Sequence, residues 1–230
     1  MFTNLALRSF RSNIELQNYL TQKSNLSSHE NRRRNITIAV IDDQAFTPQV
    51  TLQNFGYKFE PLGDIKSIDD AAKYQLILCD IKGVGRHFGA SQEGSTLIQE
   101  IKRRFPDKVV IAYSASSQAD KSVKLAKNLA DDFISKDIDN EEWIRLLDKW
   151  STIAVDPYEI WIRIRSRLAE SRIDTKQIIY LEDRYVRSVL DRDPSMSKLE
   201  KAVAGSNLPA DARAIIQGLI SSLIFRVLIG

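Results

Sequence analysis

The sequence predicts an α/β domain with a five-stranded parallel sheet, followed by a small all-helical unit. Between residues 36 and 150, short apolar runs alternate with segments of helical periodicity, as in βαβ units. Several runs are continuously apolar, which is typical of strands covered on both faces. Beyond residue 155, a helix start at Asp156-Pro157 opens a region in which helical spacing prevails.

Five apolar runs are the expected strands of the sheet. The strongest apolar character belongs to the first, third and fourth runs, ITIAVI, QLILC and KVVIAY. Because the second run contains Pro61, we expect it at the edge of the sheet or expect the strand to end there. In chain order, the expected strands cover residues 36–41, 58–63, 75–79, 108–113 and 131–135.

Helical segments separate the expected strands. The clearest of them places Leu97, Ile98 and Ile101 on one face. The expected helices of the α/β domain cover residues 48–55, 68–74, 95–105, 119–128 and 140–150.

The flanking segments have different characters. Residues 1–35 predict a short amphipathic helix and then a polar linker at 24–35, whose three arginines we expect to be solvated. The C-terminal unit, residues 156–230, begins with a capped helix, although IWIRIR also alternates as a strand would. Further helices are expected at 175–190 and 210–227, with breaks at 191–197 and 205–209.

Composition excludes several classes of protein. With 43% hydrophobic and 27% charged residues, the chain has an ordinary globular composition. The single cysteine, Cys79, allows neither an internal disulfide nor a cysteine-based zinc site. Charges interrupt the apolar residues at the N-terminus, so no signal peptide is expected and the cytoplasm is the default location.

Charge and tail composition limit the expected partners. A net charge of +3 is too small to imply a polyanion, so we do not expect DNA binding, although a helix-turn-helix over 174–204 is an alternative. The apolar tail, 214–230, is shorter than the roughly 20 residues of a membrane span. We expect its helix to pack against other helices or a second copy, with membrane association as the alternative.

Acidic residues directly follow two of the expected strands. Asp42 and Asp43 come after the first strand, and Asp80 comes after the third. Because functional groups collect at the carboxyl ends of parallel strands, we expect these carboxylates to meet. They would repel one another without a cation, and oxygen ligands suit Mg²⁺. The sequence therefore predicts a magnesium site.

Two further residues complete a set suited to phosphoryl transfer. A carboxylate can attack phosphorus to form an acyl phosphate, and Asp80 is the candidate nucleophile. Lys136, at the fifth strand, would pair with a phosphoryl oxygen, and Ser114, after the fourth, would donate a hydrogen bond to another.

Four motifs of this sequence resemble the receiver domain of two-component response regulators. They are IAVIDD (38–43), LILCD (76–80), IAYSA (111–115) and DFISK (132–136), within a resemblance that covers about residues 36–150. The resemblance implies a flavodoxin-like fold and phosphorylation of Asp80 by a histidine kinase or a phosphotransfer protein.

The same resemblance implies the roles of the other site residues. Mg²⁺ would be held by Asp43, Asp80 and the backbone carbonyl of Lys82, with Asp42 acting partly through water. Phe133 matches an aromatic switch position that couples to movement of Ser114.

The sequence departs from the receiver pattern at three places. Asp137 follows Lys136 where the family usually has proline. The loop after Asp80, IKGVGRHFGASQEG, lacks the usual Met-Pro and is longer than usual. The first helix, at 48–55, is short.

The sequence thus predicts a response regulator that signals through its helical unit, by binding a protein partner or a second copy. It would catalyse only its own phosphorylation and the hydrolysis of its aspartyl phosphate. The alternatives are a receiver-like binding module that is never phosphorylated, a DNA-binding response regulator, and a Mg²⁺-dependent phosphotransfer enzyme acting on a small substrate.

Overall fold

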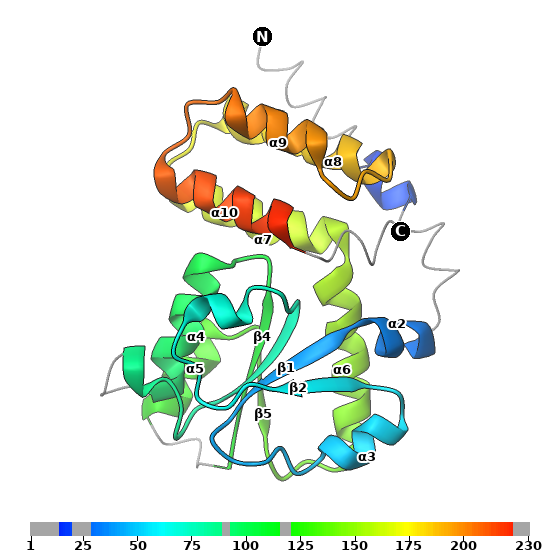
Figure 1. Ribbon diagram of the computed structural model, residues 1–230, viewed down its shortest axis with the longest axis vertical. Coiled ribbons are helices and arrows are strands. Elements are labelled where there is room, and N and C mark those ends of the chain that lie inside the picture. The colour runs from blue at the N-terminus through cyan, green and yellow to red at the C-terminus, as the bar shows by residue number, and fades with distance from the viewer. Residues whose placement is uncertain (1–13, 20–28, 89–92, 116–120, 223–230) are drawn as a thin grey trace. The chain divides into compact units, whose positions relative to one another are not determined.

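The computed structural model describes residues 14–19, 29–88, 93–115 and 121–222. The chain divides into two compact units (Figure 1). One contains residues 29–154, and the other contains residues 1–28 together with 155–230.

A five-stranded parallel sheet forms the centre of the unit at residues 29–154 (Figure 1). Its strand order is β2-β1-β3-β4-β5, which is the flavodoxin-like order. Strand β2 is added on one side of β1, and strands β3, β4 and β5 are added on the other side. The predicted sheet is confirmed, and its strands are β1 (Thr37–Ile41), β2 (Lys58–Pro61), β3 (Leu76–Asp80), β4 (Val109–Ser114) and β5 (Asp132–Ser135). Pro61 ends β2 at the edge of the sheet, where its missing N–H costs no ladder bond.

Helices connect the strands of this unit. They are α2 (His29–Asn35), α3 (Gln49–Asn54), the 3₁₀ turns η1 (Ile68–Ala71) and η2 (Arg86–Phe88), α4 (Glu93–Arg104), α5 (Lys121–Leu129) and α6 (Asn140–Val155). The helix predicted at 68–74 is wrong, since only the single turn η1 forms there. Ser67 caps that turn by accepting from the Asp69 N–H, and the Ala72 N–H donates to the Asp69 carbonyl at its end.

Helix α2 occupies residues 29–35, which were expected to belong to a solvated linker. Within this helix, the Arg33 guanidinium donates to both carboxylate oxygens of Asp148 on α6, at 2.7 and 2.5 Å. The guanidinium also lies 4.9 Å from the centre of the Tyr57 ring. One arginine of the basic run therefore links α2 to α6 within this unit.

The two faces of the sheet carry different cores. Helices α4 and α5 pack side by side over one face, above a cluster that includes Ile77, Cys79 and Ala112 (Figure 1). Cys79 is fully buried, and burial raises the pKa of its thiol. The opposite face carries an aromatic group in which Trp143 of α6 and Tyr113 of β4 pack edge-on, with ring centres 6.3 Å apart.

The other unit is helical throughout its described secondary structure. Residues 14–19 are helical, and the C-terminal helices are α7 (Pro157–Glu170), α8 (Thr175–Leu190), α9 (Ser197–Ala204) and α10 (Ala210–Ser221). The predicted cap of α7 is confirmed, since the Asp156 side chain accepts from the N–H groups of Tyr158 and Glu159. The strand alternative for this segment is therefore wrong.

The last described helix is shorter than predicted. Helix α10 was expected to reach residue 227, but Ser222 has extended backbone angles and ends it. The remainder of the apolar tail, residues 223–230, lies outside the described residues. Among the helices that the structure describes, none is both long enough and apolar enough to cross a membrane.

We predict that the Arg33–Asp148 contact stabilises the α/β unit in a pH-dependent way. Burial favours the neutral form of Asp148, but hydrogen bonds from Arg33 and Tyr57 outweigh it and lower the pKa of Asp148 below its ordinary value of 3.8. A carboxyl group with a lowered pKa stabilises the fold above its unfolded-state pKa, and this contribution is lost as the pH falls below it.

Replacing Asp148 with Asn should therefore lower the free energy of unfolding at pH 7 by about 1 to 2 kcal/mol. The deficit should disappear when the pH falls well below 3.8, where the wild-type carboxyl group is also neutral. Urea unfolding over a pH series tests this, with the exposed Asp70→Asn as the control. An equal deficit at every pH would contradict an ionic origin.

Candidate functional site

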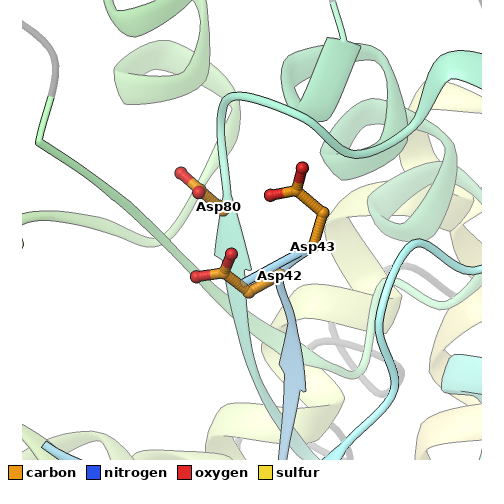
Figure 2. Close-up of side chains that lie close together, drawn as sticks. All are labelled: Asp42, Asp43 and Asp80. Carbon is orange, nitrogen blue, oxygen red and sulfur yellow. The ribbon is translucent and has the colours of Figure 1, made fainter. Parts of the chain in front are cut away.

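Three carboxylates meet at the carboxyl ends of β1 and β3. Asp42 and Asp43 directly follow β1, and Asp80 is the last residue of β3 (Figure 2). Each offers one oxygen atom, and these atoms all lie within 4.8 Å of one another. Asp42 and Asp80 are each only 5% exposed, whereas Asp43 is exposed. The two strands are neighbours at the topological switch point of the sheet, where the order of the strands reverses. This is why the three residues come together.

Lys136 places its ammonium group between the two buried carboxylates. Its Nζ lies 2.7 Å from Oδ2 of Asp80 and 2.9 Å from Oδ2 of Asp42. The backbone brings it there, because the Lys136 N–H donates to the Ser114 carbonyl at 3.0 Å and extends the pairing of β4 with β5. Asp137 in place of proline thus still allows the lysine to reach Asp80.

These contacts shift the ionisation of Asp80 and Lys136. Burial raises the pKa of the Asp80 carboxyl group, although the hydrogen bond from Lys136 opposes that change. Burial disfavours the charged form of Lys136, but hydrogen bonds to Asp80 and Asp42 outweigh it and raise the pKa of the ammonium group. Lys136 therefore remains charged at neutral pH.

Asp80 is also fixed by the backbone that follows it. Its Oδ1 accepts from the N–H groups of Ile81, at 2.7 Å, and Lys82, at 3.4 Å. The first turn of α4 packs directly on this segment, and a Cβ at Gly94 would lie only 2.1 Å from the Asp80 carbonyl oxygen. The close approach of helix and strand requires glycine at this position.

The loop after β3 folds against Asp43. Gly83 has a φ of +79°, and a Cβ at this residue would lie 2.4 Å from Oδ2 of Asp43. The Gly83 N–H donates to Oε2 of Glu93 at 3.3 Å, and the Gly85 N–H donates to Oδ1 of Asp64 at 2.7 Å. Two carboxylates outside the acidic cluster thus fix the backbone on either side of residue 84.

Ser114, Phe133 and Lys82 are the remaining predicted site residues. Ser114 is buried at the end of β4 and contacts Lys136 through its backbone carbonyl. Phe133 is paired with Ala112 on the neighbouring strand and packs against the core beneath α4 and α5. The Lys127 ammonium lies 4.6 Å from the centre of the Phe133 ring. The Lys82 N–H, as noted, points to Asp80.

Sequence reasoning missed Tyr113, which belongs to the site. Its hydroxyl donates to Oδ2 of Asp42 at 2.7 Å, and its ring centre lies 4.8 Å from Nζ of Lys136. Burial, followed by the hydrogen bond to Asp42, raises the pKa of this hydroxyl, so it stays protonated at neutral pH. The available signal was its place directly before Ser114, opposite Asp80 in the strand register.

The donor set fits a hard divalent cation. Three acidic side chains and one lysine meet in this cluster, so acidic groups outnumber the basic one. Ligand oxygens around octahedral Mg²⁺ lie about 3 to 4.2 Å apart. The observed limit of 4.8 Å is slightly longer than this range. All the offered atoms are carboxylate oxygens, which Mg²⁺ prefers.

The unit at residues 29–154 thus combines a parallel five-stranded sheet of flavodoxin-like order with three carboxylates and a lysine at the carboxyl ends of its strands. No family model and no curated protein matches this sequence. Several similar solved structures are response regulator receiver domains that match about half of this chain. Beyond residue 155, the secondary structure of the described residues is helical.

Three solved structures illustrate the similarity. A CheY-like receiver domain protein from Methanospirillum hungatei JF-1 is 18% identical and has a TM-score of 0.42, over 52% of this chain and 95% of that one. A signal receiver domain of an HD domain-containing protein from Pseudomonas fluorescens Pf-5 is 18% identical with a TM-score of 0.42, over 53% and 90%. A response regulator from Burkholderia pseudomallei with a phosphorylated aspartic acid, calcium ion and citrate is 18% identical with a TM-score of 0.39, over 80% and 97%.

We predict that Gly83→Ala weakens divalent-cation binding. The new Cβ would meet the Asp43 carboxylate at 2.4 Å and displace it, and the φ of +79° adds about 1 to 2 kcal/mol of backbone strain. We expect the Mg²⁺ affinity, measured by titration calorimetry, to fall about tenfold. Gly63→Ala is the matched control, since Gly63 has a φ of +65° but no atom within 4 Å of an added Cβ. Equal effects of both substitutions would exclude the contact with Asp43 as the cause.

We also predict that Asp80→Asn stabilises the fold without divalent cations. A carboxyl group whose pKa is raised on folding destabilises the folded state as it ionises, and burial has this effect on Asp80. The variant should unfold a few degrees higher than wild type at pH 7, in the presence of a chelator. The gain should vanish below pH 3.8, where Asp80 is protonated in both states. Thermal unfolding by circular dichroism tests this, and a lower midpoint at pH 7 would refute it.

Proposed function

We propose that this protein is a two-component response regulator that accepts a phosphoryl group on Asp80. The observation that supports this most directly is the position of Lys136, whose Nζ lies 2.7 Å from Asp80 within a cluster of three carboxylates. A cation next to the candidate nucleophile can neutralise charge on a transferring phosphoryl group. The donor would be a histidine kinase or a phosphotransfer protein.

In the proposed reaction, a carboxylate oxygen of Asp80 attacks the phosphorus of a phosphohistidine. A bond forms between this oxygen and phosphorus while the phosphorus–nitrogen bond breaks, and the imidazole leaves with the electron pair and takes up a proton. Hydrogen bonds from Ile81 and Lys82 hold the other oxygen of Asp80, which limits rotation of the carboxylate. Lys136 would follow the negative charge from the carboxylate to the phosphoryl oxygens.

Mg²⁺ would be held by Asp43, Asp80 and the Lys82 carbonyl, with Asp42 acting partly through water. Bound there, it would neutralise phosphoryl oxygens and orient the donor. The exposed carboxylate of Asp43 suits this role because it can be reached from solvent. Asp42 instead makes three hydrogen bonds within the protein, which suits a partial, water-mediated role.

The output would pass through Ser114 and Phe133 to a protein–protein interaction of the helical unit. Ser114 is buried beside the site, and Phe133 is half-buried two residues before the end of β5, positions that allow a coupled rearrangement. The helical unit would bind a protein partner or a second copy, in the cytoplasm and without DNA. We propose no turnover of an external substrate beyond phosphorylation and hydrolysis at Asp80.

We predict that the wild-type protein forms a single Mg²⁺-dependent phosphoryl adduct with acetyl phosphate. The Asp80 oxygen would displace acetate from phosphorus, leaving one acyl phosphate that intact-protein mass spectrometry detects. Asp80→Asn should abolish the adduct because an amide is a poor nucleophile. Asp70→Asn, which removes an exposed carboxylate from η1, should react as wild type does.

Three outcomes would reject the proposal. An adduct that persists on the same peptide of Asp80→Asn would show that another residue is modified. No adduct with acetyl phosphate, phosphoramidate or a phosphorylated histidine kinase would favour a binding module that is never phosphorylated. Steady release of phosphate from an added phosphomonoester would instead favour a phosphotransfer enzyme.

A further inference from the structure

The buried carboxylate of Asp42 is almost fully engaged within the protein. Its Oδ1 accepts from the Gln44 N–H at 2.8 Å. Its Oδ2 accepts from the Tyr113 hydroxyl at 2.7 Å and from Lys136 at 2.9 Å. Because a carboxylate oxygen offers about two acceptor positions, Oδ2 has none left for a metal ion. This oxygen therefore serves to hold Lys136.

Tyr113 is itself held in place from several directions. The residue is 1% exposed, and its ring packs edge-on against Phe46, at 5.7 Å between ring centres, and against Trp143, at 6.3 Å. These contacts fix the direction in which its hydroxyl points. The same ring lies 4.8 Å from the Lys136 ammonium, within cation–π distance. Tyr113 thus contacts the lysine with its ring and reaches it again through Asp42.

We propose that Tyr113 is a positioning residue for phosphoryl transfer, whose hydroxyl fixes Asp42 and thereby keeps Lys136 directed at Asp80. This inference depends on the function proposed above. The Lys136 side chain has four flexible bonds, and a competing carboxylate that could rotate would draw it away from Asp80. With Oδ2 of Asp42 held by the tyrosine, the ammonium stays in contact with both carboxylates.

Tyr113→Phe isolates this role because it keeps the packed ring and removes only the hydroxyl. We expect the rate of phosphorylation by acetyl phosphate to fall about tenfold. Affinity for trifluoroberyllate, a tetrahedral analogue of a phosphoryl group on a carboxylate, should fall similarly, because this ligand needs the lysine. Mg²⁺ affinity should not weaken, since the freed Oδ2 of Asp42 becomes available to the metal.

Two controls separate positioning from general loosening of the fold. Tyr74→Phe also removes one hydroxyl from a buried tyrosine of this unit, but Tyr74 packs in the core beneath α4 and α5. It should behave as wild type in all three measurements. In a double-mutant cycle, Tyr113→Phe should have no further effect on trifluoroberyllate affinity once Lys136 is replaced with Ala, because the hydroxyl acts through the lysine.

The outcomes distinguish the positioning role from its alternatives. If Tyr113→Phe reacts at the wild-type rate, Tyr113 has no positioning role. If Mg²⁺ affinity and the phosphorylation rate fall together, or the two substitutions are additive in the cycle, the hydroxyl supports the site only structurally. A wild-type protein that neither reacts nor binds trifluoroberyllate would reject the proposed function itself, which is a different result from equal reactivity of wild type and variant.

Discussion

Two buried carboxylates share a single ammonium group, and the geometry of the whole site depends on that arrangement. Two like charges removed from water at the edge of a sheet repel each other strongly unless a cation separates them. Lys136 supplies the cation, within hydrogen-bond distance of both Asp42 and Asp80. The exposed Asp43 remains outside this pairing, so the local balance of charge still favours a divalent ion. One lysine therefore offsets the repulsion between the two buried carboxylates, while the Asp43 carboxylate stays outside the pairing.

The arrangement of the strands brings Lys136 close to both carboxylates. Lys136 is 94 residues from Asp42 and 56 residues from Asp80 along the chain. All strands are parallel, so the residue after each strand arrives at the same edge. The glycines at positions 83 and 94 then let the next loop and helix come close to the acidic residues. Small residues around the cluster are as much a part of its construction as the charged ones.

The sequence could predict the strands and the acidic cluster, which depend on local pattern and parallel topology, although the helix expected at 68–74 is only a single turn. Continuous apolar runs indicated the strands. The acidic residues that follow these runs were expected to meet, because parallel strands end at the same edge of a sheet. It could not predict helix α2, which depends on a contact between Arg33 and Asp148, 115 residues apart. Nor could the sequence show that Tyr113 belongs to the site. A tyrosine in an apolar strand looks like a core residue until the hydrogen-bond partner of its hydroxyl is known. The end of α10 was missed because apolar periodicity continues past Ser222.

The burial of Cys79 has a practical consequence for spectroscopy. It is the only cysteine in the sequence, its thiol is fully enclosed in the core, and its raised pKa keeps the reactive thiolate scarce at neutral pH. A second cysteine introduced at an exposed position would react with a fluorophore or spin label, while the thiol of Cys79 would not react. Site-specific labels can therefore be attached to either unit of the native protein without first replacing the natural residue.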